Sequence, residues 1–186
     1  MNIGIIGYGM VGKAFANGFR DNVLHISDPA VNDVTIKDVC QSEPDFIAVC
    51  VPTPTVNNEI DASILTETLH TINEYYSGIV VVKSTVTPDF LKEYDTLDFQ
   101  LVYNPELLSD RTATEDFINP SMIIIGSNHH NAAYFIKQAY KESSNVLIEH
   151  QRIFFVDLVS ASMLKYGFNT FYATKVTFMN EMYQIL

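Results

Sequence analysis

The chain has 186 residues, of which 47% are hydrophobic and 18% charged, as in a folded globular protein with one full core. Its 22 acidic residues outnumber its 11 basic residues, which gives a formal net charge of −11. So acidic a surface repels phosphate backbones and anionic lipid, and it argues against nucleic-acid or membrane partners.

The cysteines and the N-terminus indicate a compartment. Two cysteines, Cys40 and Cys50, without a signal-peptide pattern fit a reducing cytosol better than a disulfide framework. No apolar run approaches the roughly 18 residues of a membrane span. We therefore expect a cytoplasmic protein, and no metal site is expected in it.

Short apolar runs alternate with longer amphipathic segments along the chain. Runs rich in Val and Ile without period-two alternation are typical of strands buried on both faces. They are IGIIG (3–7), VLHIS (23–27), FIAVCV (46–51), IVVVK (79–83), QLVYN (100–104) and MIIIG (122–126). Helix-like stretches lie near 10–20, 61–76, 87–94 and 129–142, and a last helix is expected from about 157. The alternation predicts an α/β fold with a doubly wound, mainly parallel sheet, followed by a long C-terminal helix.

The first loop, in IGIIGYGMVGKAF, has the G-x-G-x-x-G spacing between a strand and a helix. The first glycine permits a tight turn, the second lets the backbone approach a pyrophosphate, and the third lets helix and strand pack closely. Phosphates would then lie at the helix N-terminus, where free N–H groups favour negative charge. The candidate residues here are Gly7, Gly9, Met10, Val11 and Gly12. The loop predicts a Rossmann-like dinucleotide site.

Asp28 follows the second predicted strand, 21 residues after Gly7. An acidic side chain at this place hydrogen-bonds the adenosine ribose hydroxyls and repels a 2′-phosphate, which favours NAD over NADP. The alternative is a glycine-rich turn with an unrelated surface aspartate.

Open α/β sheets bind ligands at the carboxyl ends of their strands. The segments that follow the later strands are VPTPT (51–55), KSTVTP (83–88), NPELL (104–108) and INPSMIIIG (118–126). Singly, each is an ordinary loop. In this order, together with the glycine loop and MLKYGFNTFYATKVTFMNEM, they resemble the UDP-glucose/GDP-mannose dehydrogenase family of NAD-dependent nucleotide-sugar dehydrogenases.

The resemblance implies a domain organisation and further cofactor contacts. Residues 1–156 would form the family's N-terminal NAD-binding domain, and 157–186 would begin its central, dimerisation helix. The family's C-terminal UDP-sugar domain would be absent. Additional NAD contacts would come from Val51, Pro52, Thr53, Ser84 and Thr85.

The family oxidises a sugar C6 alcohol to a carboxylate in two hydride transfers, with two NAD. By resemblance, Thr85 would help hold a catalytic water and Glu106 would act as acid/base or in thioester hydrolysis. Lys165 and Asn169, one helical turn apart, would stabilise the oxyanion at C6. The alternatives are a solvated lysine, a surface amide, a capping glutamate, and a threonine that caps the helix PDFLKEY.

The chain departs from the family pattern on the substrate side. The family's cysteine nucleophile lies downstream of the central helix, and neither Cys40, in a helical stretch before the third strand, nor Cys50, at the end of that strand, has its context. Without a thiolate the aldehyde cannot be oxidised as a thioester. NPE continues as LLSDRT, and Ser162 replaces a glutamate. We expect a shortened, catalytically incomplete protein with a weak UDP-sugar site. The alternatives are a non-catalytic NAD-binding or dimerisation module and a relative of 3-hydroxy-acid dehydrogenases.

The last predicted helix carries two apolar stripes, so it is expected to be buried on more than one side. One stripe could pack on the NAD domain, and the other would need a partner, by its heptad-like spacing a second copy. The stripes are Leu164, Phe168, Phe171, Phe178 and Met182, and Tyr172, Val176, Met179, Tyr183 and Leu186. We expect a homodimer through this helix; the alternative is that the second stripe meets the missing domain.

Overall fold

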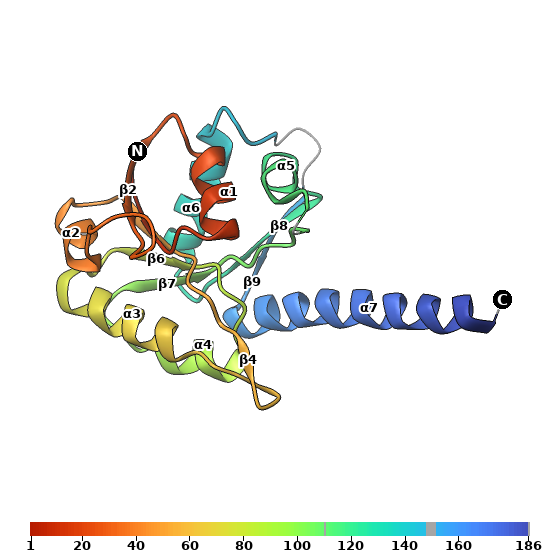
Figure 1. The fold of residues 1–186 in the computed structure, drawn as a ribbon. Coiled ribbons are helices and arrows are strands. Elements are labelled where there is room, and N and C mark those ends of the chain that lie inside the picture. Colours follow the sequence, from red (N-terminus) through yellow and green to blue (C-terminus); the bar gives the residue numbers. More distant parts are fainter. Residues whose placement is uncertain (110, 148–151, 186) are drawn as a thin grey trace.

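The computed structural model describes residues 1–109, 111–147 and 152–185 (Figure 1). Within them a seven-stranded sheet has the order β2-β1-β3-β6-β7-β8-β9. Each of the six predicted apolar runs forms a strand, so the predicted α/β fold is confirmed. The strands are β1 (Asn2–Ile6), β2 (Val23–Ser27), β3 (Phe46–Val49), β6 (Ile79–Val82), β7 (Gln100–Tyr103), β8 (Met122–Gly126) and β9 (Arg152–Val156).

Helices cover both faces of the sheet, as a doubly wound fold requires (Figure 1). One core contains side chains of α1 (Met10–Gly18), α5 (Ala113–Ile118) and α6 (His130–Glu142). The opposite core contains side chains of α2 (Ile36–Gln41), α3 (Ser63–Tyr75), α4 (Pro88–Tyr94) and the start of α7 (Leu158–Ile185). Because both faces are buried, the central strands are apolar throughout and read as continuous runs.

Three elements were not predicted. The strand β9 lies at the sheet edge, and its Phe154 and Phe155 are half-exposed. The helix α5 has six residues, which is too short for a helical period to be recognised. The third element is a small hairpin of β4 (Thr55–Val56) and β5 (Glu59–Ile60), whose turn residues Asn57 and Asn58 both have positive φ. An Asn-Asn pair at a hairpin turn is a signal that could have predicted it.

Side chains join β7 to β8 where the sheet changes direction. These two strands are antiparallel and share one ladder pair, Tyr103 with Gly126. The Asn104 side chain donates to the Ile124 carbonyl at 2.7 Å, and the Ser127 hydroxyl donates to the Leu101 carbonyl at 2.6 Å. Side-chain bonds therefore supplement a short backbone ladder here, and Asn104 is fixed at the end of β7.

The helix α7 packs on the domain only through its first turns. Leu158, Ala161 and Ser162 are buried, and the helix then extends away from the sheet (Figure 1). The Ser162 hydroxyl donates to the Val86 carbonyl at 2.7 Å. Among the described residues, no helix is both long enough and apolar enough to cross a membrane.

The expectation that one apolar stripe of α7 packs on the NAD domain is wrong. In the first stripe only Phe168 is partly covered, and its other members are exposed. In the second, the four members up to Tyr183 are exposed, and Leu186 lies outside the described residues. The reason is geometric: α7 leaves the domain surface before most of either stripe begins.

Candidate functional site

The glycine loop between β1 and α1 is built by two glycines that no larger residue could replace without movement. Gly7 has φ +88°, and a Cβ on it would lie 2.8 Å from the Cys50 carbonyl. A Cβ on Gly12 would lie 2.1 Å from the Gly7 carbonyl oxygen. Gly9, the N-cap of α1, differs because a Cβ there would meet nothing within 4 Å. The open space at Gly9 is where a bound pyrophosphate can approach the backbone.

Asp28 lies beside this loop, one residue after β2. Its carboxylate accepts the backbone N–H of Tyr8 at 2.6 Å and that of Ala30 at 2.8 Å. These two bonds fix the carboxylate at the edge of the loop, where a ribose next to the pyrophosphate would lie. The arrangement fits NAD, whose ribose hydroxyls donate to such a carboxylate.

One cavity of about 640 Å³ brings nearly all the predicted site residues together. It runs over the carboxyl ends of β1, β2, β3, β6 and β7 and is closed on one side by α7. Gly12 packs behind the loop and is not part of the lining. The predicted residues that line it are Gly7, Gly9, Met10, Val11, Asp28, Val51, Pro52, Thr53, Ser84, Thr85, Glu106, Lys165 and Asn169.

The loops after β3 and β6 are cross-linked by their own side chains. The Thr53 hydroxyl donates to the Thr85 carbonyl at 2.9 Å, and the buried Ser84 hydroxyl donates to the Val51 carbonyl at 2.6 Å. These hydroxyls hold the cavity wall in place. The alternative that Thr85 caps the following helix is not what forms, since Thr87 is the N-cap of α4.

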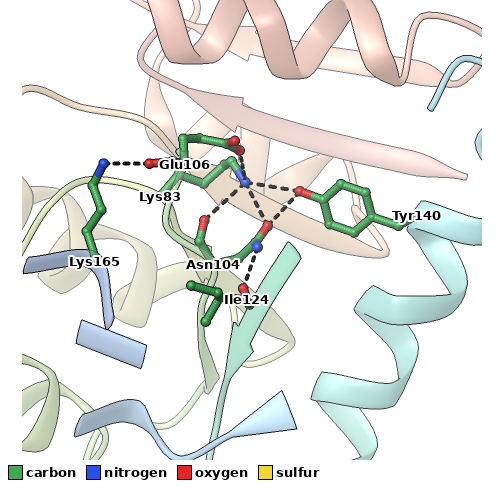
Figure 2. A network of polar contacts seen from close by, with 6 residues as sticks. All are labelled: Lys83, Asn104, Glu106, Ile124, Tyr140 and Lys165. Atoms are coloured by element: carbon green, nitrogen blue, oxygen red, sulfur yellow. Dashed lines mark hydrogen bonds and ion pairs between the residues drawn. The ribbon is translucent and has the colours of Figure 1, made fainter. Parts of the chain in front are cut away.

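Glu106 is held from two sides by lysines (Figure 2). Its main-chain carbonyl accepts Lys165 Nζ at 2.5 Å, and its carboxylate forms an ion pair with Lys83. Glu106 therefore does not cap a helix, and Lys165 is not a freely solvated lysine. Burial lowers the pKa of Lys165, an effect that the Glu106 carboxylate partly opposes. Asn169 follows one turn later on α7, exposed to the cavity.

Lys83 is a site residue that sequence reasoning missed. Its side chain has no exposed surface, and Nζ donates to the Asn104 carbonyl at 3.2 Å, to Asn104 Oδ1 at 2.7 Å and to the Tyr140 hydroxyl at 3.1 Å (Figure 2). Burial acts to lower the pKa of Lys83, but the Glu106 carboxylate and the other acceptors outweigh it and leave the pKa raised. The signal was a lysine directly after a buried strand, in KSTV.

The two thiols lack the properties of a nucleophile. Cys50 lines the cavity, and burial raises the pKa of its thiol to about 12. Cys40 is buried, and burial raises its pKa to about 11. Both are protonated near neutral pH, whereas a reactive cysteine needs a lowered pKa. Within the described part of the chain, no group of three or more His, Cys, Asp or Glu could hold a metal ion.

A second cavity, of about 570 Å³, adjoins the first. It lies between the loop after β7, the segment before β8 and the start of α7. Both cavities are lined by Glu106, Leu108, Lys165 and Asn169. The acid, the amine and the amide therefore lie where two bound molecules could meet. Asp110, in the segment LLSDRT, lies outside the described residues.

Comparisons with known proteins, by sequence and by structure, indicate one family. The chain is 33% identical over 155 residues to the UDP-glucose 6-dehydrogenase of Rickettsia bellii, covering 78% of this chain and 35% of that protein. It is 30% identical over 156 residues to the GDP-mannose 6-dehydrogenase of Pseudomonas syringae pv. syringae, covering 74% of this chain and 34% of that protein. The chain thus spans about a third of the length of these curated relatives.

The fold is also found among solved structures. A UDP-glucose dehydrogenase of the archaeon Pyrobaculum islandicum superposes with a TM-score of 0.81 at 22% identity, over 97% of this chain and 52% of that one. The model of the UDP-glucose/GDP-mannose dehydrogenase family, NAD binding domain, matches residues 32–144. The chain belongs to the UDP-glucose/GDP-mannose dehydrogenase family and contains its NAD-binding domain.

Proposed function

We propose that the chain is the cofactor-binding part of a nucleotide-sugar dehydrogenase of the UDP-glucose 6-dehydrogenase type, which oxidises the sugar C6 alcohol. The observation that carries the proposal is the meeting of two cavities at Glu106, Lys165 and Asn169. NAD would occupy the cavity over the glycine loop, and the sugar would enter from the second cavity. UDP-glucose is preferred as substrate because relatives with that name match, although GDP-mannose dehydrogenases match as well.

Each residue would have a role that follows from its place. Asp28 would bind the adenosine ribose, and the free N–H groups of Met10 and Val11 would face the phosphates. Lys165 and Asn169 would stabilise negative charge at the C6 oxygen as its proton leaves, because preorganised donors act most strongly where charge develops.

Two further residues would handle the proton and the water. Glu106 would exchange the proton or activate the water that Thr85 helps to hold. Bound NAD supplies the hydride acceptor for the alcohol oxidation.

We further propose that these 186 residues do not complete the reaction by themselves. Oxidation of the aldehyde through a thioester needs a thiolate, and the chain's two cysteines are protonated in their surroundings. NADH formation from UDP-glucose is expected to be absent or very slow. Robust conversion of UDP-glucose to UDP-glucuronate by this chain would contradict the proposal. The second candidate is a non-catalytic NAD-binding or dimerisation module.

Residues 1–156 would act as the NAD domain, and the helix from 157 would act in assembly as a homodimer. The support is the set of large apolar side chains on α7 that the domain leaves exposed, such as Phe178, which is 59% exposed, and Tyr183, which is 83% exposed. Sedimentation equilibrium of the parent chain is expected to give twice the monomer mass. Replacement of both residues by Asp should return the mass to that of a monomer, and a parent chain that is already monomeric would refute the dimer.

The cofactor site can be tested by calorimetry with a matched pair of glycines. Gly9→Ala should fold normally, because its Cβ meets nothing, but should bind NAD at least about tenfold more weakly because the methyl group occupies the pyrophosphate's approach. Gly167→Ala is the control, since a Cβ at this position on α7 also meets nothing and lies away from the cavity. Unchanged NAD affinity in Gly9→Ala would remove the glycine loop from the site.

A further inference from the structure

The ion pair between Lys83 and Glu106 joins the core of the protein to the cofactor cavity. Lys83 has no exposed side-chain surface, whereas the Glu106 side chain is 14% exposed and lines both cavities. Three aromatic rings surround Lys83 Nζ: their centroids lie 5.2 Å away for Phe15, 5.7 Å for Phe117 and 5.8 Å for Tyr140. Glu106 is the one carboxylate paired with it among the described residues.

The network directs the ammonium towards Glu106. Tyr140 donates its hydroxyl hydrogen to Asn104 Oδ1 at 2.6 Å, so its oxygen is free to accept from Lys83. Asn104 is fixed in turn by its bond to the Ile124 carbonyl. These neutral acceptors orient Nζ, but the charge of Lys83 is balanced by Glu106 (Figure 2). The carboxylate is therefore turned inward, towards the lysine.

The two ends of the cofactor cavity differ in what they would bind. Asp28 and the glycine loop form one end, where the adenosine ribose and the pyrophosphate bind in this fold. Glu106 and Lys165 line the other end, over the ends of the central strands, so they would face the half of a bound dinucleotide that carries the nicotinamide. This ring is a cation in NAD⁺ and neutral in NADH. A bare carboxylate at this end would hold the oxidised cofactor in preference to the reduced one.

We infer that Lys83 is a positioning residue that holds the Glu106 carboxylate inward and neutralises it towards the nicotinamide, so that the cavity does not favour NAD⁺ over NADH through that charge. The inference rests on the proposed function only in that the cavity takes NAD. It matters for a dehydrogenase because tighter binding of NAD⁺ than of NADH opposes transfer of a hydride to the bound cofactor. A lysine that served the core alone would leave the relative affinities unchanged.

The test is the ratio of the dissociation constants of NADH and NAD⁺ for the whole chain, measured by calorimetry. Lys83→Met places an unbranched thioether among the three rings and leaves Glu106 unpaired. The ratio Kd(NADH)/Kd(NAD⁺) is expected to rise on the order of tenfold, the effect of one uncompensated charge near the ring. Glu106→Gln leaves Lys83 as the unpaired charge, and the ratio should fall by a similar factor.

The double variant Lys83→Met/Glu106→Gln removes both charges and should return the ratio to within about twofold of the parent value. Lys92→Met removes an exposed lysine on α4 outside the cavity, and it should leave the ratio unchanged. Either single variant decides the matter if the other does not fold. Equal changes in both constants, or no change, would show that Lys83 serves the core alone. A parent chain that binds neither form would instead overturn the proposed cofactor site.

Discussion

Two regions of the chain place side chains in surroundings of the opposite polarity. At Lys83 a full positive charge lies inside the core, and along the outer part of α7 large apolar side chains face solvent. The buried charge is compensated within the chain, because its hydrogen-bond acceptors and its counter-ion are all present (Figure 2). The apolar face of α7 has no such complement within the described residues.

The difference shows which unfavourable features a chain must compensate within its own fold and which it can leave uncompensated. A buried charge without partners costs several kcal/mol, so every group around Lys83 must be supplied by the fold. An exposed apolar helix face costs far less, because leaving such side chains in water only forgoes the gain from burying them. Each region can be tested by substitutions whose effect on the free energy of unfolding is measured. The effects should be large in the first region and small in the second.

The largest effect is expected from Glu106→Gln. This change leaves Lys83 buried without a counter-ion, and it should lower the free energy of unfolding by about 3 to 5 kcal/mol in denaturant titrations. Lys83→Met should cost less, because the carboxylate left behind is 14% exposed and can turn towards solvent in the cavity. Equal losses of unfolding free energy in the two variants would show that an unpaired Lys83 and an unpaired Glu106 are equally unfavourable.

A smaller loss is expected from Tyr140→Phe. The ring stays in the core, but the hydroxyl that donates to Asn104 and accepts from Lys83 is removed, which should cost about 1 to 2 kcal/mol. Tyr134→Phe, on the same helix, is the matched control, because Tyr134 is 60% exposed and should change stability by less than about 0.5 kcal/mol. A similar result for both tyrosines would argue against an energetic role for the network.

Alkaline pH should weaken the same region. The pKa of Cys50 is raised by burial from 9.0 to about 12, so between these values the unfolded chain loses a proton that the folded chain keeps. The folded state binds more protons there, and stability therefore falls as pH rises through this window. At pH 10, ionisation of one such thiol in the unfolded chain lowers the free energy of unfolding by about 1 kcal/mol.

The variant Cys50→Ser isolates this contribution, since serine does not ionise in the same range. The fall in unfolding free energy between pH 9 and 11 should be shallower than in the parent chain. It should not vanish, because the pKa of Cys40 is also raised, to about 11. An unchanged slope would mean that the Cys50 thiol ionises alike in the folded and unfolded chain.

The smallest effect on stability is expected from Phe171→Ser. This side chain is 63% exposed on α7, so its loss should change the free energy of unfolding at micromolar concentration or below by less than about 0.5 kcal/mol. At high protein concentration a larger loss should appear if the helix pairs, because association stabilises the folded state by mass action. Denaturant titrations at two concentrations measure both effects, and a large loss at the lower one would place Phe171 in a monomer core.

Much of the fold could be predicted because local pattern and burial coincide. The five interior strands, β1, β3, β6, β7 and β8, are covered on both faces, so they appear in the sequence as apolar runs, and the edge strand β2 was also recognised. The edge strand β9 was missed although IFFV (153–156) is itself an apolar run, because so short a run directly before a helix cannot be distinguished from part of that helix. The helix α5 fails for another reason: six residues span too few turns for a period to show.

The candidate site was predicted unevenly for a similar reason. Gly7 and Gly12 could be recognised in the sequence because the backbone geometry of the loop requires glycine, and the structure shows the contacts that a Cβ would make. Lys83 gives only a weak signal, its position directly after a buried strand, because a lysine in a sequence is usually a solvated one. Its burial depends on Glu106, 23 positions later, and on Tyr140, 57 positions later.

The sequence alone determined six of the seven sheet strands, the glycine loop and the family resemblance, because each depends on neighbouring residues or on the order of short motifs. Only the tertiary structure decided that Lys83 and Glu106 form a pair between core and cavity, and that α7 leaves the domain with its apolar side chains uncovered. Both outcomes depend on distances between segments far apart in the chain. Such distances are fixed by packing, which no local pattern contains.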